Sequence, residues 1–178
     1  MLRVTGGIFR GTLLHCPRDI RPTSGRIKEY IFSQVGEFTA GARIIDLFAG
    51  SGALGIEALS RKAREAVFVD KSYRSITVIR KNLQKMGLES AVIKADALRY
   101  IKNFKNEPFD LIFLDPPYRE YEPSTLITAI EKSEILLKGG HLVYELSVGI
   151  PQPETQILLP NSYRTLADTS IGIWFRPD

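Results

Sequence analysis

The chain has 178 residues, 44% of them hydrophobic, which suits one domain with a full core and leaves no room for a second. Its single cysteine, Cys16, excludes an internal disulfide and makes a reducing cytoplasm the simplest setting, and no Cys/His cluster has metal-ligand spacing. The longest apolar runs fall far short of a membrane span, and residues 1–7 lack the apolar core of a signal peptide, so we expect neither a membrane anchor nor a metal.

The net charge of +4 is concentrated at the start of the chain, where residues 1–28 hold six Lys or Arg and one Asp. Glycines interleave with these arginines, and no helical or strand period organises the segment for long. We therefore expect residues 1–22 to form a mobile or hairpin-like basic arm, part of the same domain as residues 23–178, that contacts phosphates through Arg3, Arg10 and Arg18. A solvated tail is the alternative.

A helix is predicted next, capped by Thr23 and running to about Glu37, with Ile27, Ile31, Val35 and Phe38 facing inward. Four apolar runs follow, and each ends at an acid: Asp46, Asp70, Asp96 and Asp115. Helical patterns lie between the runs. Strands that alternate with helices predict a parallel sheet, whose strand carboxyl ends share one ligand-binding edge. The four acids should meet there.

The segment after Asp46 predicts a nucleotide-binding loop. Gly50, Gly52 and Gly55 form a G-x-G-x-x-G pattern, and Asp70 follows Gly50 by twenty residues, where a ribose-binding acid belongs. A dinucleotide and S-adenosylmethionine both fit this pattern. Because Asp46 would repel a pyrophosphate but suits an ammonium and a sulfonium, we rank the methyl donor first. The helix predicted after Asp70 carries a second basic cluster, which consists of Lys71, Arg74, Arg80, Lys81 and Lys85. We expect this cluster to be a solvent-exposed face of that helix.

Asp115-Pro116-Pro117-Tyr118 follows the fourth apolar run. The prolines stiffen the backbone and donate no hydrogen bond, so the Asp115 carboxylate and the Pro116 carbonyl can accept both hydrogens of an exocyclic amine, while Tyr118 offers a face for base stacking. The alternative is a turn that closes a strand.

The remaining elements are a helix over Ser124–Leu137 that stops at Gly139-Gly140, a strand over His141–Glu145, and strands over Gln156–Leu159 and Ile171–Phe175.

The order of Asp46–Gly52, Asp70, Asp96 and Asp115–Tyr118 resembles the Rossmann-like, S-adenosylmethionine-dependent methyltransferases that modify exocyclic amines. Arg21-Pro22-Thr23, with Arg26, and the Asp46–Arg61 segment look like the RsmD family, bacterial methyltransferases of guanine N2 in small-subunit ribosomal RNA. The similarity weakens after about Glu145. It implies an α/β fold with a mostly parallel seven-stranded sheet flanked by helices, in which the last strand inserts antiparallel.

The charge placement, the motifs and the resemblance together suggest roles for particular residues. The catalytic set is Asp115, Pro116, Pro117 and Tyr118, and the RNA-binding set is Arg3, Arg10, Arg18, Arg21, Thr23 and Arg26. The set expected around S-adenosylmethionine is Asp46, Phe48, Ala49, Gly50, Ser51, Gly52, Asp70, Lys71, Asp96, Ala97 and Asp115.

The expected partner is ribosomal RNA or a small-subunit assembly intermediate, bound by a monomer. Three alternatives remain open at this stage. Adenine-N6 methylation of RNA or DNA uses the same acids and tetrapeptide, and only the N-terminal segment argues against it. An NAD-dependent oxidoreductase has no use for Asp115–Tyr118, and a non-catalytic RNA-binding or assembly protein would not need that tetrapeptide intact.

Overall fold

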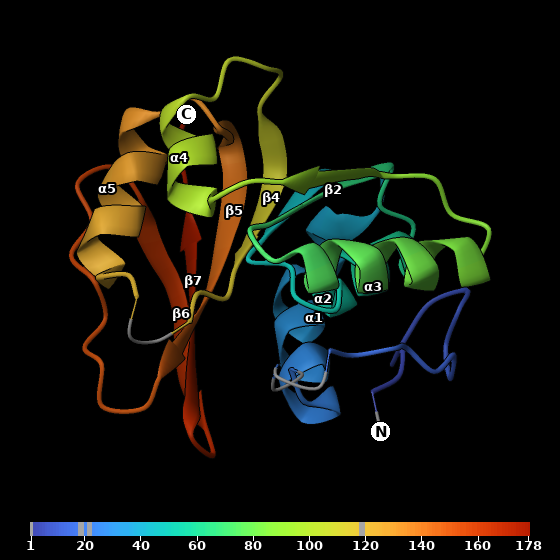
Figure 1. The fold of residues 1–178 in the computed structure, drawn as a ribbon. Coiled ribbons are helices and arrows are strands. Elements are labelled where there is room, and N and C mark those ends of the chain that lie inside the picture. Colours follow the sequence, from blue (N-terminus) through green and yellow to red (C-terminus); the bar gives the residue numbers. More distant parts are fainter. Residues whose placement is uncertain (1, 18–19, 21–22, 118–119) are drawn as a thin grey trace.

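We describe the chain from a computed structural model, which covers residues 2–17, 20, 23–117 and 120–178. Among these residues, seven strands form one sheet in the order β3-β2-β1-β4-β5-β7-β6 (Figure 1). The strands are β1 Arg43–Leu47, β2 Glu65–Asp70, β3 Ala91–Lys94, β4 Phe109–Leu114, β5 Leu136–Ser147, β6 Leu159–Leu166 and β7 Thr169–Phe175. The helices are α1 Gly25–Thr39, α2 Ala53–Ser60, α3 Tyr73–Lys85, α4 Ala97–Lys102 and α5 Pro123–Lys132.

Strands β1 to β5 pair in parallel, whereas β7 runs antiparallel to both β5 and β6. The predicted fold, a mostly parallel sheet with an inserted antiparallel last strand, is therefore confirmed. This strand order places the end of β2 on one side of β1 and the ends of β4 and β5 on the other.

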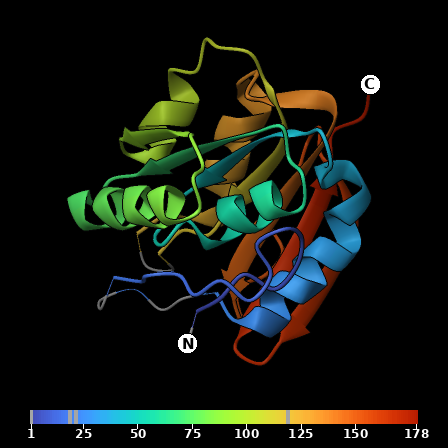
Figure 2. The same ribbon diagram turned by 90° about the vertical axis from the view of Figure 1, so that its right-hand side faces the viewer.

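Apolar side chains cover both faces of the sheet, which explains why the strands read as continuous apolar runs. Successive residues of a strand point to opposite faces: Ile44 packs with helices α1, α2 and α3, whereas Ile45 packs with α4 and α5. Figure 2 shows the two helical layers on either side of the sheet. Within the described part of the chain, no helix is both long and apolar enough to cross a bilayer.

Two predicted helix boundaries and one predicted side-chain orientation were wrong. Helix α1 is capped by Ser24, whose hydroxyl accepts from the Ile27 amide at 3.3 Å, and not by Thr23. Phe38 does not face inward: it is 49% exposed and stacks on His141, with ring centroids 4.2 Å apart. Helix α5 ends at Lys132 and not at Leu137, because Leu136 pairs with Phe109 and starts β5.

The strand predicted over Gln156–Leu159 was also wrong, since β6 begins at Leu159. The amides of residues 156, 157 and 158 all donate to one carboxylate oxygen of Glu131, on helix α5, at 2.7–3.0 Å. Amides that donate to a side chain are not available for hydrogen bonds between strands, so β6 begins at Leu159, the residue after the last of these amides.

The described residues 2–17 of the basic arm include a hairpin packed on the fold, which agrees with the hairpin-like form of the prediction. Arg3 and Leu13 form an antiparallel bridge, and Val4 and Leu14 are buried in the core. The segment runs alongside α2 and α3 in both ribbon views (Figures 1 and 2). Two residues of α2, Glu57 and Ser60, attach it through hydrogen bonds.

Glu57 is fully buried and accepts hydrogen bonds from the Thr5 amide at 2.8 Å, the Gly6 amide at 2.7 Å and Lys28 Nζ at 3.2 Å. Lys28 is also fully buried and donates to the Arg3 carbonyl. One carboxylate therefore ties the arm, α1 and α2 together.

Replacing Glu57 with alanine is expected to lower the free energy of unfolding by about 3–5 kcal/mol, because Lys28 would keep a buried charge without its carboxylate partner. Denaturant titration measures the change. Glu65→Ala is the matched control: Glu65 pairs with Arg43 but its side chain is 43% exposed, so its loss should cost less than about 1 kcal/mol. Equal losses for the two variants would contradict the role assigned to Glu57.

Candidate active site

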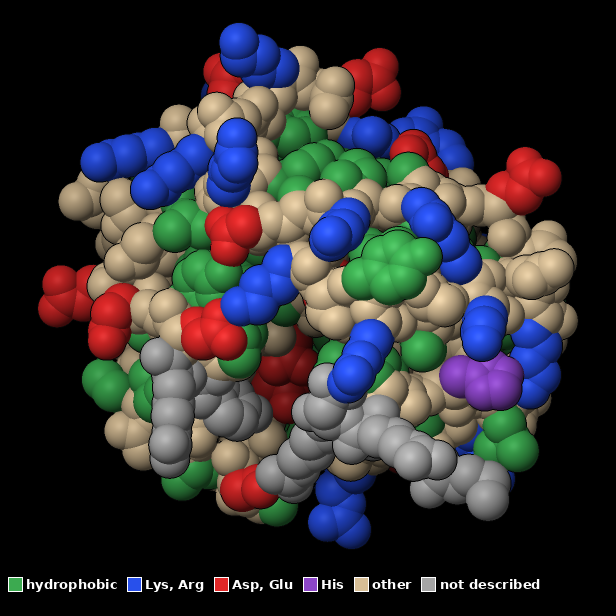
Figure 3. All heavy atoms as spheres, viewed as in Figure 1, with side chains coloured by type: hydrophobic (Ala, Val, Ile, Leu, Met, Phe, Trp, Pro, Cys, Tyr) green, Lys and Arg blue, Asp and Glu red, His purple; other side chains and the backbone are tan. Residues whose placement is uncertain are grey.

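A cavity of about 700 Å³ opens where the parallel strands end. It is lined by most of the residues predicted for the site: Thr23, Arg26, Asp46, Phe48, Ala49, Gly50, Ser51, Asp70, Lys71, Asp115, Pro116 and Pro117. Figure 3 shows acidic atoms deep in a hollow, with Lys and Arg side chains on its rim. Of the other predicted residues, Arg3, Arg10, Gly52, Asp96 and Ala97 do not line this cavity, and Arg18, Arg21 and Tyr118 lie outside the described residues.

The glycine loop is held against the end of β2 by Asp70. One carboxylate oxygen accepts from the Gly50 amide at 2.8 Å, and the other accepts from the Ser72 amide at 2.7 Å. Phe48 has φ 63°, Gly50 has φ 56° and Gly52 has φ 76°, so the loop turns through the left-handed region at three residues. Because an ionised carboxylate has about four acceptor positions, Asp70 can still accept from a ligand's hydroxyl groups.

Gly55 has a packing role. A Cβ at Gly55 would lie 2.3 Å from the Phe68 ring on β2, so only glycine lets α2 approach the sheet this closely. The third glycine of the pattern therefore sets the helix position, and with it the position of the loop above Asp46.

Asp46 lies in β1, one residue before the strand ends, and is buried. Its Oδ2 accepts from the Gly55 amide at 2.9 Å. Burial raises the pKa of Asp46 well above its ordinary value, and the neighbouring Asp115 and Asp70 raise it further, against the effect of the Gly55 bond. The floor of the cavity thus carries a carboxyl group whose charged form is costly unless a cation lies against it.

Asp115 follows β4 directly. Burial raises the pKa of Asp115 to about 7, while a hydrogen bond from the Thr23 side chain opposes the rise. Thr23, predicted to bind RNA, therefore contacts the predicted catalytic acid. With a pKa of about 7, Asp115 is a much better proton acceptor than an ordinary carboxylate with a pKa near 3.9.

Asp96 caps helix α4, accepting from the Arg99 amide at 2.8 Å, and its other oxygen accepts from the Tyr121 hydroxyl. Burial pushes the pKa of Asp96 up, but the bonds from Tyr121 and Arg99, together with nearby Lys71, hold it below its ordinary value. Sequence reasoning gave no role to Tyr121, whose ring also packs edge-on against Phe48 at 5.0 Å.

The chain after the tetrapeptide is fastened at a second point, where Lys71 forms an ion pair with Glu120. Together with the Tyr121 bond, this contact connects the segment after β4 to the ends of β2 and β3. In the sequence, the signal for this role was an aromatic residue, Tyr121, between the tetrapeptide and the next helix. The sequence did not show that Asp96 would be its partner.

Sequence reasoning also missed the wall of the cavity opposite the glycine loop. Glu145 on β5 and the β6–β7 turn from Leu166 to Thr169 line it. Ala167 in this turn has φ 56°, a left-handed conformation that lets the chain reverse tightly.

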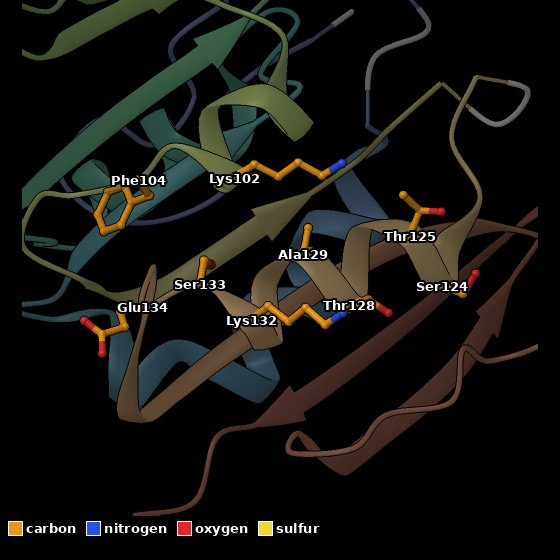
Figure 4. A pocket seen from close by; sticks show the side chains of 9 residues that line it. All are labelled: Lys102, Phe104, Ser124, Thr125, Thr128, Ala129, Lys132, Ser133 and Glu134. Carbon is orange, nitrogen blue, oxygen red and sulfur yellow. The ribbon is translucent and has the colours of Figure 1, made fainter.

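A second hollow of about 620 Å³ lies between α4 and α5 (Figure 4). Hydroxyl side chains of α5 and two lysines, Lys102 and Lys132, line it. None of the residues predicted for the site lines this hollow, so the predicted chemistry belongs to the first cavity.

The sheet order, the glycine loop and the Asp-Pro-Pro segment at the end of β4 define a methyltransferase with a Rossmann-like fold. Residues 2–165 match the model of a family described as Conserved hypothetical protein 95, and the chain belongs to this family, which confirms the resemblance drawn from the sequence.

Its relatives carry a more specific name. Ribosomal RNA small subunit methyltransferase D of Escherichia coli is 36% identical over 155 residues, which cover 84% of this chain and 78% of that protein. The protein of the same name from Haemophilus influenzae is 30% identical over 178 residues, covering 97% and 90%. The solved structure of yhhF from Escherichia coli superposes with a TM-score of 0.90 at 28% identity, covering 98% of this chain and 97% of that one.

Proposed function

We propose that this protein transfers a methyl group from S-adenosylmethionine to the exocyclic N2 amine of a guanine in small-subunit ribosomal RNA. The observation that carries the proposal is the meeting, in one cavity, of the Asp70-anchored glycine loop and the Asp115-Pro116-Pro117 segment. The names of the relatives support ribosomal RNA as the substrate and not the adenine or dinucleotide alternatives.

The residues present fit the methyl donor. The loop over Phe48–Ser51 brings backbone atoms to the cavity wall, and Asp70 holds acceptor positions for ribose hydroxyls. The buried carboxyl of Asp46 suits a cationic group. When bound, S-adenosylmethionine supplies an electrophilic methyl group on a positively charged sulfur. Asp96 and Ala97, predicted near the adenine, lie next to Tyr121, which would have to share Asp96 with the ligand.

The target amine would be held by Asp115 and the Pro116 carbonyl, each accepting one of its hydrogens. This arrangement turns the nitrogen lone pair toward the methyl group, and alignment within about 3–3.5 Å supplies much of the catalysis. Asp115, with a pKa of about 7, can also take the proton that the amine releases. A guanine inside a duplex cannot reach this position, so the base must be unpaired or flipped, and Tyr118 would stack on it.

A labelled methyl donor tests the proposal. The protein is incubated with ribosomal RNA, small-subunit particles, DNA and protein, and the labelled product is digested and identified by mass spectrometry. The proposal expects N2-methylguanosine from RNA or from the particle. A product consisting only of N6-methyladenosine, or no labelled RNA at all, contradicts it.

The hairpin arm would supply RNA affinity and no chemistry. Arg3 and Arg10 are exposed, and neither lines the cavity. The Lys and Arg side chains that stand among acidic ones around the hollow in Figure 3 would meet phosphates while the acidic hollow receives the base. We also propose that the protein acts as a monomer in the cytoplasm, where its RNA substrate is assembled.

Replacing Arg3, Arg10 and Arg18 together with alanine is expected to weaken RNA binding while leaving cofactor affinity unchanged. Each lost phosphate contact should flatten the plot of log affinity against log salt by roughly 0.7–0.9. The control removes the same charge from the far side of the molecule, by replacing Lys102, Lys105 and Lys132 on and near α4 and α5 (Figure 1). If the salt slope and the RNA affinity of the arm variant are unchanged, the arm has only a packing role. The basic face of α3 would then be the next surface to test for RNA binding.

A further inference from the structure

Glu145 lies beside Asp115 where the parallel strands end. Strands β4 and β5 pair in parallel with Leu114 opposite Tyr144, so the next residues, Asp115 and Glu145, are neighbours on adjacent strands. Both side chains line the cavity, and only 6% of Glu145 is exposed. Two carboxyl groups therefore stand side by side in the same wall.

This wall belongs to the substrate side of the cavity. The glycine loop and Asp70 lie on the β2 side of β1, whereas Glu145 lies two strands away on the other side. Near Glu145 the cavity is lined by Thr23, which bonds to Asp115, and by Thr169 at the start of β7, the strand that pairs with β5. A base whose amine reaches Asp115 must present its adjoining edge to these groups.

Guanine and adenine differ at the atom next to the reacting amine. In guanine the N2 amine adjoins N1–H, a donor, whereas in adenine the N6 amine adjoins an unprotonated N1, an acceptor. Asp115 and the Pro116 carbonyl suit either amine, so they cannot separate the two bases. A carboxylate beside them accepts from guanine N1–H and repels the lone pair of adenine N1.

We propose that Glu145 is a specificity-determining residue that accepts a hydrogen bond from N1–H of the target guanine while Asp115 and Pro116 hold its N2 amine. This inference rests on the proposed function and names the edge of the base that the site reads. It assigns different tasks to the two neighbouring carboxyl groups: Asp115 acts on the reacting nitrogen, and Glu145 selects the base.

The test uses 2-aminopurine, which keeps the N2 amine but lacks both the hydrogen on N1 and the O6 carbonyl of guanine; the comparison with Glu145→Gln separates the effect of N1 from that of O6. An RNA substrate whose methylated guanine has been mapped is prepared with either base at that position, and transfer rates are compared. Wild-type protein should prefer guanine by about 10–100-fold, because 2-aminopurine leaves a buried carboxylate facing a lone pair. Glu145→Gln should slow methyl transfer to guanine and bring the transfer rates for the two bases within about 3-fold of each other. The reason is that an amide side chain can either accept from guanine N1–H or donate to 2-aminopurine N1.

Asp168→Asn is the matched control, since Asp168 contributes another carboxyl group to the same cavity from the β6–β7 turn. Its guanine preference should stay that of the wild type. Thermal unfolding and S-adenosylmethionine binding are measured for both variants to show that Glu145→Gln retains its fold and its cofactor site.

The outcomes separate the inference from the function on which it rests. A wild-type guanine preference that persists in Glu145→Gln, or a wild-type protein that uses both bases equally, overturns the role of Glu145. A folded Glu145→Gln protein that is inactive on both bases overturns it as well. A wild-type protein that methylates no guanine in any RNA overturns the proposed function itself.

Discussion

Asp115→Ala is expected to lower the rate of methyl transfer by about 100-fold or more while leaving S-adenosylmethionine affinity within a few-fold of wild type. Asp115 lies on the β4 side of the cavity, where the proposed target amine would be held, and the loop that would hold the cofactor lies across β1. Its loss removes an acceptor that matters most as the amine reacts. Single-turnover kinetics and calorimetry measure the two effects separately.

The pH dependence of transfer gives a second readout of the same residue. Because burial raises the pKa of Asp115 to about 7, the group is largely protonated below that pH and ionised above it. Only the ionised form can take the released proton, so the transfer rate should rise as pH increases through about 7. Asp115→Asn has no group to titrate and should lose this step.

Thr23→Val is the matched variant for the pH measurement. The Thr23 side chain donates a hydrogen bond that favours ionised Asp115, so its removal should raise the pKa of Asp115 further and move the rate profile toward alkaline pH. If Asp115→Asn keeps the wild-type profile, or both Asp115 variants transfer methyl at the wild-type rate, the tetrapeptide is only a turn.

Much of this site was predictable because its residues are ordered by the strands that precede them. An acid after a buried parallel strand lies at the common carboxyl edge whatever the details of the helices, and Asp46, Asp70 and Asp115 line one cavity as predicted. The prediction that all four acids meet there was wrong for Asp96, because it follows β3, the outermost strand of the sheet, and does not line the cavity. The loop glycines were equally visible, because a tight strand-to-helix turn requires positive φ at Gly50 and Gly52.

The residues that sequence reasoning missed depend on contacts between distant segments. Glu145 gains its place from the register of β4 against β5, which aligns residues thirty positions apart. Tyr121 gains its role from the oxygen of Asp96 that the α4 cap leaves available. The end of β5 was predictable from its apolar run. Its start at Leu136 depends on pairing with the distant Phe109, and the helical pattern of the local sequence does not show that pairing.

An effect of similar magnitude is expected for a variant on the cofactor side of the site. Asp70→Ala is expected to weaken S-adenosylmethionine binding by about 100-fold, because the variant loses the proposed acceptors for ribose hydroxyls and the hydrogen bond that holds the Gly50 amide. Isothermal calorimetry should find micromolar-range affinity for the wild type and a binding too weak for a sharp isotherm in the variant.

Asp110→Ala is the matched control for Asp70→Ala. Asp110 also accepts a hydrogen bond from a backbone amide, that of Arg43 at 2.7 Å, but it does so at the opposite end of β1. Its loss should therefore lower the unfolding temperature without changing cofactor affinity, which separates loss of a ligand contact from loss of a structural bond. Wild-type affinity in Asp70→Ala, or tight NADH binding with no detectable S-adenosylmethionine binding in the wild type, would overturn the assignment of this side of the cavity.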